Sequence, residues 1–250
     1  MEGNPMLSSL LDPERSVASL VLERSECADV FLRHQIDFCC RGNVSLSVAA
    51  ESRGLEVTQL LTELDHVISD RTRTFELNPA TLDTARLIEH IVSKHHHYLR
   101  QVLPSVQFLA QKVGRVHGER NPKLRTLDAL VQELATALLP HLDEEEQSLF
   151  PLLCSSSSDG GAIESELTAM LDDHLAVAKL LQATRAAADD FVPPDWACNS
   201  YHTLISELAH LERDVFTHIH LENHVLRPRF LAEAAPIAAA TLLAKSAARS

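Results

Sequence analysis

The sequence predicts an all-α protein in which a small helical domain precedes an up-down-up-down four-helix bundle. Three observations support this fold class. The chain contains only 7 glycines and 4% aromatic residues, whereas leucine and alanine are abundant, as is typical of helical proteins. Four amphipathic segments of similar length fill its second part, separated by short stretches of helix-breaking residues. Two of these segments repeat one local motif, so the bundle contains an internal repeat.

Length, charge and cysteine usage exclude several classes of function. A chain of 250 residues can form one large domain, or a domain with a smaller one, around a substantial core. The formal net charge of −13 argues against nucleic acid or an anionic membrane as a partner. No apolar run approaches the ~18–20 residues of a membrane span, and no secretory signal pattern heads the chain. The 5 unevenly spaced cysteines resemble cytosolic thiols, so we expect a cytoplasmic protein.

Residues 12–75 are expected to form the small domain. Helix-spaced apolar residues and Gly54, which should end the second helix, predict three helices at 16–34, 45–53 and 56–68. A unit of this size is marginal for independent stability. The periodicity is lost over 69–79, which therefore reads as a linker.

The bundle is expected over residues 79–232, and an Ala-rich tail follows at 233–250. Its four predicted helices are 81–113, 123–154, 162–189 and 199–231. The joints between them contain glycine, proline or serine clusters, and short joints favour antiparallel neighbours.

The motif that is repeated in the bundle is His-x-x-x-Glu. It occurs as His141 with Glu145 and again as His218 with Glu222. Four residues are about one turn of an α-helix, ~5.4 Å of rise, so the imidazole and the carboxylate project from the same face. Both pairs fall within the apolar stripe of their helix, where polar side chains are costly unless something inside the bundle satisfies them. The pattern predicts metal ligands.

Histidines on the other two helices complete the predicted ligand set. His174 is bracketed by the apolar stripe of the third helix. On the first helix His95, His96 and His97 are consecutive; the stripe excludes His97, leaves His95 central and puts His96 at the margin. The 45 residues from His96 to the second-helix motif match the 44 from His174 to the fourth-helix motif, but His95 and His97 fit this spacing nearly as well. The residues alone leave this ligand open.

Four imidazoles and two carboxylates are the donor set of a two-metal site. With Glu145 and Glu222 as bridges, each ion receives two imidazoles. Carboxylate-bridged dinuclear sites in four-helix bundles typically hold iron or manganese, and imidazole-rich ligation without thiolate favours iron. We therefore expect two iron ions with oxo or hydroxo and carboxylate bridges, and with open positions for water, O₂ or NO. A single such pair is usually a surface ion pair, and a lone His174 would read as a core histidine; the matched repeat favours metal.

Other polar side chains of the bundle are expected in solvent: Asp143, Glu144, Glu146, His220 and His224. Asp214, one turn before His218, fits either a partner that orients an imidazole or a surface charge.

Cys39 and Cys40 form a second group of interest. Vicinal cysteines beside Gly42, in a turn between helices, are poorly placed for a structural disulfide and suit exposed reactive thiols. The alternative is a pair of half-buried small apolar residues.

Six motifs together carry a resemblance over about residues 15 to 230. They are Ile36-Asp-Phe-Cys-Cys-Arg-Gly42, Leu87-Ile-Glu-His-Ile-Val92, Leu103-Pro104, Lys112-Val-Gly-Arg-Val-His-Gly118, His141-x-x-x-Glu145 with Leu149-Phe-Pro151, and His218-x-x-x-Glu-Asn223 with Pro228. With these, the chain resembles the iron-sulfur cluster repair di-iron proteins, which join a vicinal-cysteine domain to a hemerythrin-like bundle. The family more often has glycine at the position of Arg41.

The resemblance implies a site, residue by residue. Its iron ligands fall on His96, His141, Glu145, His174, His218 and Glu222, and the frame set by Leu103-Pro104 selects His96 over His95. Cys39 and Cys40 become the functional thiols. Some members have a carboxylate one turn before the second-helix histidine, where this chain has Ala137; Asp173 is a candidate substitute.

The function implied is cytoplasmic repair of iron-sulfur clusters damaged by nitrosative or oxidative stress, with damaged iron-sulfur proteins as partners. The centre would either donate iron or reduce NO to nitrous oxide, with the thiols docking on the client, relaying iron, supplying electrons or carrying NO. The main alternative is a hemerythrin-like carrier or sensor of O₂ or NO. Reversible O₂ carriers tend to have a fifth histidine where this chain has Ala178, which weakens that alternative. The sequence decides neither whether the protein is an enzyme nor whether it forms a homodimer.

Overall fold

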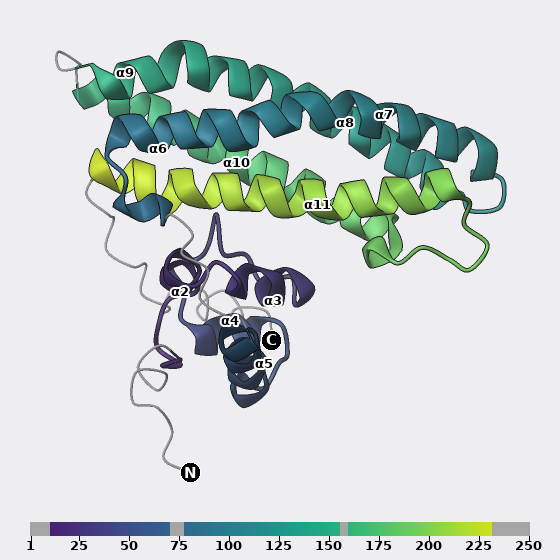
Figure 1. The fold of residues 1–250 in the computed structure, drawn as a ribbon, viewed down its shortest axis with the longest axis horizontal. Coiled ribbons are helices and arrows are strands. Elements are labelled where there is room, and N and C mark those ends of the chain that lie inside the picture. The colour runs from purple at the N-terminus through teal and green to yellow at the C-terminus, as the bar shows by residue number, and fades with distance from the viewer. Residues whose placement is uncertain (1–10, 71–77, 156–159, 232–250) are drawn as a thin grey trace, which may run out of the picture.

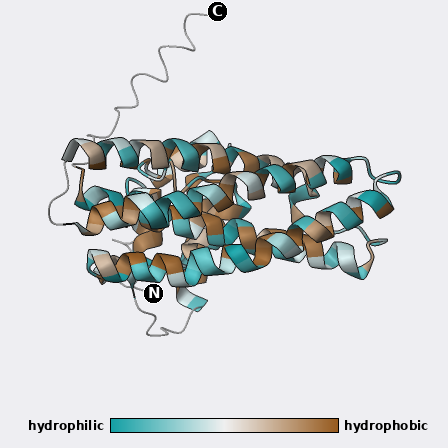
Figure 2. Cartoon of the chain, turned by 90° about the horizontal axis from the view of Figure 1, so that it is seen from above, coloured by the Kyte–Doolittle hydropathy of each residue, from teal (hydrophilic) through white to brown (hydrophobic). Residues whose placement is uncertain are grey.

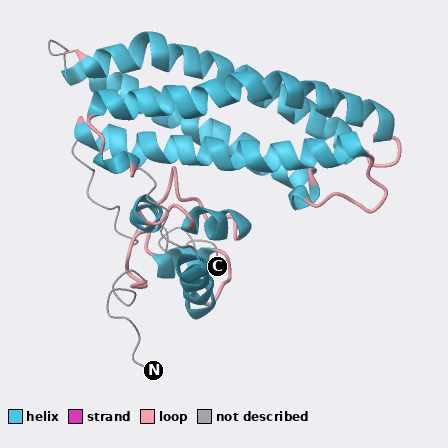
Figure 3. Ribbon diagram, viewed as in Figure 1, coloured by secondary structure: helices cyan, strands magenta, loops and turns pink. Residues whose placement is uncertain are grey.

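The computed structural model describes residues 11–70, 78–155 and 160–231, and these residues form helices and connecting loops without a β-strand (Figure 3). The all-α prediction is therefore confirmed. A four-helix bundle lies above a smaller group of short helices (Figure 1). The Ala-rich tail predicted at 233–250 lies outside the described residues. Within the described ranges no helix is both long and apolar enough to cross a membrane.

In the described part of the small domain there are four helices: α2 (Val17–Glu23), α3 (Cys27–Arg33), α4 (Leu46–Ser52) and α5 (Val57–Asp70). Ser16 and Ser45 cap α2 and α4 by accepting hydrogen bonds from backbone N–H groups of the first turn. Gly54, with a φ of 66°, follows the end of α4 as predicted.

The prediction of one helix over 16–34 is wrong, because the chain turns between α2 and α3. Arg24 ends α2, and its guanidinium donates to the carbonyl of Ile68 on α5 at 3.0 Å and pairs with Glu26 at 2.9 Å. This turn lets α3 pack separately against α5 and bury Val30 and Phe31, which are both 0% exposed.

The bundle is built from four helical rods joined by short connections. The first rod follows η1 (Pro79–Thr81) and contains α6 (Thr84–Ile91), η2 (Val92–His96) and α7 (His97–His117). The second contains α8 (Lys123–Glu144), η3 (Glu145–Leu149) and α9 (Phe150–Cys154). The third is α10 (Gly160–Ala187), followed by η4 (Asp189–Phe191). The fourth contains α11 (Asn199–Leu221), η5 (Glu222–Leu226) and η6 (Arg227–Arg229).

The rods pack in the order that their short joints require, with α7 against α8, α8 against α10, and α11 against α7 (Figure 1). Apolar and polar residues alternate around each rod, as amphipathic helices require (Figure 2). The apolar residues form two separate clusters along the bundle. The larger includes Leu99, Leu142 and Val215, and the smaller, at the α6 and α9 end, includes Ile91 and Leu149.

The small domain packs on the fourth rod, where α3 contacts α11. A second contact is made by the loop between α3 and α4, residues 34–45, which rises from the small domain toward the bundle (Figure 1). We call residues 36–42 of this loop the Cys loop. It carries Cys39 and Cys40.

Candidate metal centre

A layer of buried polar side chains separates the two apolar clusters of the bundle. All six predicted ligands lie in this layer, and none is more than 7% exposed: His96, His141, Glu145, His174, His218 and Glu222. On every rod the layer falls between residues of the larger cluster and residues of the smaller one. The fold therefore brings together polar side chains from all four rods.

The local backbone of three rods is unusual at this layer. The segments η2, η3 and η5 are π-helical turns, and they contain His96, Glu145 and Glu222 respectively. A π-turn accommodates one residue more than an α-turn, and such turns are frequent at functional sites. In the first rod the wider turn allows the consecutive residues His95 and His96 to be buried together.

The ligand atoms gather into two groups. In the first, the Nε2 atoms of His96 and His218 are 3.2 Å apart, His218 Nε2 is 2.9 Å from Glu222 Oε1, and His96 Nε2 is 3.4 Å from Glu145 Oε2. Four ligand atoms of these residues lie within 4.8 Å of one another. This spacing fits coordination of one cation.

The second group uses the remaining oxygens of the same carboxylates. His141 Nε2 is 3.3 Å from Glu145 Oε1, and His174 Nε2 is 3.1 Å from Glu222 Oε2 and 3.8 Å from Glu145 Oε1. Each carboxylate thus presents one oxygen to each group. This is the arrangement in which two carboxylates bridge two ions.

The donor atoms fit cations better than they fit one another. His141 Nε2, His174 Nε2, both oxygens of Glu145 and Oε2 of Glu222 are buried without a hydrogen-bond partner among the described residues. Buried polar atoms are normally satisfied, because leaving them unpaired is costly. One cation in each group would satisfy these atoms, so the chemistry of the donor set fits a dinuclear centre.

Protonation at the layer also favours metal. Burial lowers the pKa of His96 to about 4 and that of His141 to about 3, so both imidazoles are neutral at pH 7, the form that binds metal. Burial and the nearby Glu222 carboxylate raise the pKa of Glu145 well above its usual range. Burial also opposes ionisation of Glu222, but His218 and His174 hold its pKa well below the usual range. A cation would allow both carboxylates to ionise.

Three imidazoles are oriented by a contact at their other ring nitrogen. His96 Nδ1 lies 2.9 Å from Glu146 Oε1, an oxygen that also accepts from Arg100. His174 Nδ1 lies 3.0 Å from Asn223 Oδ1. His141 Nδ1 lies 3.5 Å from Asp173 Oδ2. Partners of this kind fix the tautomer and raise the basicity of metal-binding histidines.

These contacts correct the expectation that Glu146 faces solvent, since it holds His96. They also place the neighbouring histidine outside the ligand groups. His95 Nδ1 is 2.8 Å from Asp214 Oδ1, and its ring stacks on His218 at 5.8 Å between centroids. The structure therefore brings His96, and not His95, to the carboxylates. Asp214 orients an imidazole, but it is that of His95.

His220 and His224 were expected in solvent, and this is wrong. His220 is 2% exposed and its Nδ1 donates to the carbonyl of Phe38 at 3.0 Å. His224 Nε2 donates to the carbonyl of Cys39 at 2.8 Å. The fourth rod is buried on two sides, against the bundle and against the Cys loop. Phe216, an apolar residue on that second side whose ring centroid lies 6.2 Å from that of Phe38, was the sequence signal for this contact.

The Cys loop is held in a compact turn by one carboxylate. Asp37 Oδ1 accepts from the backbone N–H of Cys39 at 3.1 Å, from that of Cys40 at 2.8 Å and from Cys39 Sγ at 3.3 Å. A Cβ on Gly42 would lie 2.3 Å from the carbonyl oxygen of Phe38 and 2.7 Å from Ala18 Cβ, so only glycine fits there.

The expectation of two exposed thiols is wrong for Cys39. Its side chain is 0% exposed, and burial, followed by Cys40 and Asp37, raises its pKa well above the usual range. Cys40 is half-buried, and the two sulfur atoms are 3.5 Å apart.

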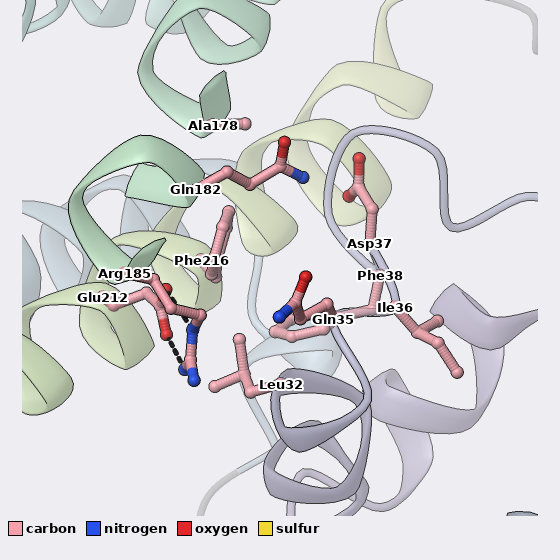
Figure 4. A pocket seen from close by; sticks show the side chains of 10 residues that line it. All are labelled: Leu32, Gln35, Ile36, Asp37, Phe38, Ala178, Gln182, Arg185, Glu212 and Phe216. Carbon is pink, nitrogen blue, oxygen red and sulfur yellow. Dashed lines mark hydrogen bonds and ion pairs between the residues drawn. The ribbon is translucent and has the colours of Figure 1, made fainter. Parts of the chain in front are cut away.

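A small pocket lies between the Cys loop and the bundle (Figure 4). Asp37 and Phe38 line one side, and Ala178 of α10 lines another. At its edge Arg185 pairs through two nitrogens with Glu212, whose side chain is buried. Ala178, one turn after His174, therefore faces the small domain and supplies no further donor to the centre.

His141 is the ligand nearest to solvent, at 7% exposed. The cleft beside it is lined by Ala137, Glu144 and Asp173. The small side chain of Ala137 leaves the acidic groups of Glu144 and Asp173 as the charges at this opening.

Comparison with known proteins matches both parts of the chain. Residues 87–230 match the hemerythrin HHE cation binding domain, and residues 13–68 match ScdA_N, described as a domain of unknown function. The chain is 30% identical to the iron-sulfur cluster repair protein ScdA of Staphylococcus haemolyticus, over 88% of this chain and 100% of the relative. It is 31% identical to the iron-sulfur cluster repair protein YtfE of Yersinia pseudotuberculosis, over 87% of this chain and 96% of that one.

Proposed function

We propose that this chain repairs damaged iron-sulfur clusters with a di-iron centre. It belongs to the hemerythrin HHE family and to the iron-sulfur cluster repair proteins, in which an ScdA_N domain is joined to this bundle. We further propose that it works in the cytoplasm on iron-sulfur proteins damaged by nitrosative or oxidative stress. We assign the vicinal-cysteine domain to residues 12–75 and the hemerythrin-like bundle to residues 79–232.

The observation that carries this proposal is the convergence of six buried ligand side chains, several of which have polar atoms without a hydrogen-bond partner among the described residues. His96 and His218 would hold one iron, His141 and His174 the other, and Glu145 and Glu222 would bridge them. When bound, the iron ions supply redox chemistry and open positions for small ligands such as NO or O₂. Glu146, Asn223 and Asp173 keep the imidazoles oriented, and the two apolar clusters exclude water from both sides.

Two mechanisms are compatible with this site. In the first, iron is the cargo and is passed to a damaged cluster. The acidic side chains of Glu144 and Asp173 beside His141 support this mechanism, because carboxylates at an opening attract and guide a divalent cation.

In the second mechanism NO is the substrate. Two molecules of NO, two protons and two electrons give nitrous oxide and water, and oxidation of Cys39 and Cys40 to a disulfide would supply both the protons and the electrons. The separation of 3.5 Å between the two sulfur atoms supports this source.

Direct measurement separates the mechanisms. Iron-loaded protein is mixed without oxygen with a cluster-depleted iron-sulfur enzyme, and iron transfer and recovered activity are followed. A parallel sample receives NO, and nitrous oxide is measured by gas chromatography. Recovered activity without nitrous oxide supports iron donation, and nitrous oxide with thiol loss supports NO reduction. If neither recovered activity nor nitrous oxide is observed, the proposed repair function is contradicted.

A carrier of O₂ is the alternative function. It would show a stable and reversible oxy-complex in air by absorption spectroscopy. Ala178 occupies the position of a fifth histidine and faces the pocket of Figure 4, so we expect no such complex.

A further inference from the structure

We propose that Asn223 couples the Cys loop to the metal centre through His174, an inference that rests on the proposed di-iron site. Asn223 follows Glu222 directly and is 6% exposed. Its Oδ1 lies 3.0 Å from His174 Nδ1, and its Nδ2 donates to the carbonyl oxygen of Cys39 at 3.0 Å. One buried side chain therefore touches both the peptide of a thiol residue and the ring of a ligand.

The chemistry of the three groups fixes the direction of both hydrogen bonds. The carbonyl of Cys39 can only accept, so the amide nitrogen of Asn223 must face it. The amide oxygen then faces His174 and can only accept, so Nδ1 of His174 carries a proton. This leaves the lone pair of Nε2 directed at Glu145 and Glu222. The Cys loop carbonyl thus selects the tautomer of His174 that binds metal.

The Cys loop is rigid enough to pass on a change at the thiols. Asp37 holds the N–H groups of both Cys39 and Cys40, and Gly42 packs with no free space against Phe38. A change at either sulfur that moves this turn must displace the carbonyl of Cys39. The displacement reaches the centre through Asn223. Coupling of this kind is reciprocal, so metal binding must in turn stabilise the Cys loop.

A second donor to the same carbonyl provides a matched control. His224 Nε2 lies 2.8 Å from the carbonyl oxygen of Cys39, and its ring lies 5.0 Å from that of His220, which is not one of the six proposed ligands. His224→Leu therefore removes one hydrogen bond to the Cys loop and leaves the path to His174 intact. Asn223→Leu removes both halves of the path. Asn223→Asp, which has nearly the same shape, keeps an acceptor for His174 Nδ1 and loses only the donor to Cys39.

The test measures two quantities in the full-length protein and the three variants: the affinity for iron, and hydrogen exchange of the backbone amides of residues 36–42 with and without iron. We expect iron to slow exchange in the wild type and in His224→Leu, and to have no effect on exchange in either Asn223 variant. Asn223→Leu should bind the iron held by His141 and His174 about 10- to 100-fold more weakly, whereas Asn223→Asp should bind this iron with the wild-type affinity. Circular dichroism of each variant confirms that the helices are formed.

The outcomes separate this inference from the proposed function. A wild-type protein that binds no iron contradicts the di-iron site itself. If the wild type binds iron but Asn223→Asp keeps the iron-dependent protection of residues 36–42, or His224→Leu loses it, the coupling through Asn223 is wrong while the centre stands.

Discussion

Single residues determine the chemistry of the centre through the atoms that the fold leaves unsatisfied. Glu145 is buried with no hydrogen-bond partner for either oxygen within the described part of the chain, and Glu222 lacks one for Oε2. Such side chains are tolerated in a bundle core when a cation compensates them. The same two residues would be the bridges between both ions, so their loss should affect both ions together.

Replacing either bridge should therefore remove most of the iron. Glu145→Ala and Glu222→Ala each delete one donor from both groups, so we expect both proteins to bind well below two iron ions. Glu133→Ala, an exposed carboxylate on the same helix as His141, is the control and should bind iron normally. The measurement is iron content after reconstitution and desalting. Normal iron in both bridge variants would contradict the ligand assignment.

The two thiols should differ in reactivity. Burial and the Asp37 carboxylate raise the pKa of Cys39, so little of it is thiolate at neutral pH. In a protein whose exposed Cys154 and Cys198 are replaced by Ser, alkylation at pH 7.5 should be slower for Cys40→Ser than for Cys39→Ser. Asp37→Asn should speed the reaction of Cys39, because a neutral amide no longer opposes the thiolate. Equal rates for the two variants, which both retain the buried Cys27, would refute this account.

Residue identities at the centre were predictable only in part. Periodicity identified His141, Glu145, His174, His218 and Glu222 as inward-facing. It could not separate His95 from His96, because a π-turn changes the angular position of the residues that it contains. Contacts that cross between distant segments, such as Glu146 with His96, leave no periodic signal in the sequence.

At the scale of elements, two features, one within the bundle and one within the Cys loop, can be tested separately. One is the ion pair between Arg185 on α10 and Glu212 on α11, and the other is the tight turn at Gly42. The ion pair could not be recognised from the sequence, because it joins two helices; a turn at Gly42 was expected, but its close contact with Ala18 was not.

Arg185→Leu should destabilise the bundle by about 3 kcal/mol, because it leaves the Glu212 carboxylate buried and unpaired. Burial already raises the pKa of Glu212, and without the guanidinium it will rise further. Protonation of Glu212 removes the buried charge, so the loss in free energy of unfolding should be largest at pH 7 and smaller near pH 5. Arg213→Leu, which breaks an exposed pair with Asp29, is the control and should cost about 1 kcal/mol or less. Urea unfolding at both pH values provides the measurement. A deficit for Arg185→Leu no larger than for the control would be inconsistent with this role.

Gly42→Ala should destabilise the small domain by about 1–3 kcal/mol, since the added Cβ meets the Phe38 carbonyl and Ala18. Gly160→Ala, where a Cβ meets no atom within 4 Å, is the matched control. Thermal unfolding of the two variants tests this, and equal midpoints would show that the Cys loop tolerates a side chain at position 42.

At the scale of the whole molecule, a bundle with a polar layer is joined to a small domain that delivers two cysteines to its fourth rod. The four long helices could be predicted from amphipathic segments that lie between helix-breaking residues, because helix periodicity is a local property of the sequence. The docking of the small domain did not, because it depends on the second buried face of α11. Hydrogen bonds from His220, Asn223 and His224 to the Cys loop hold the two parts together at this face.

Iron content together with a Mössbauer spectrum, on protein purified without chelators, tests the central claim most directly. The account predicts two iron ions per chain in a coupled, carboxylate-bridged pair. Fewer than about one iron per chain, or a spectrum of isolated single ions, would contradict a dinuclear centre held by these six side chains.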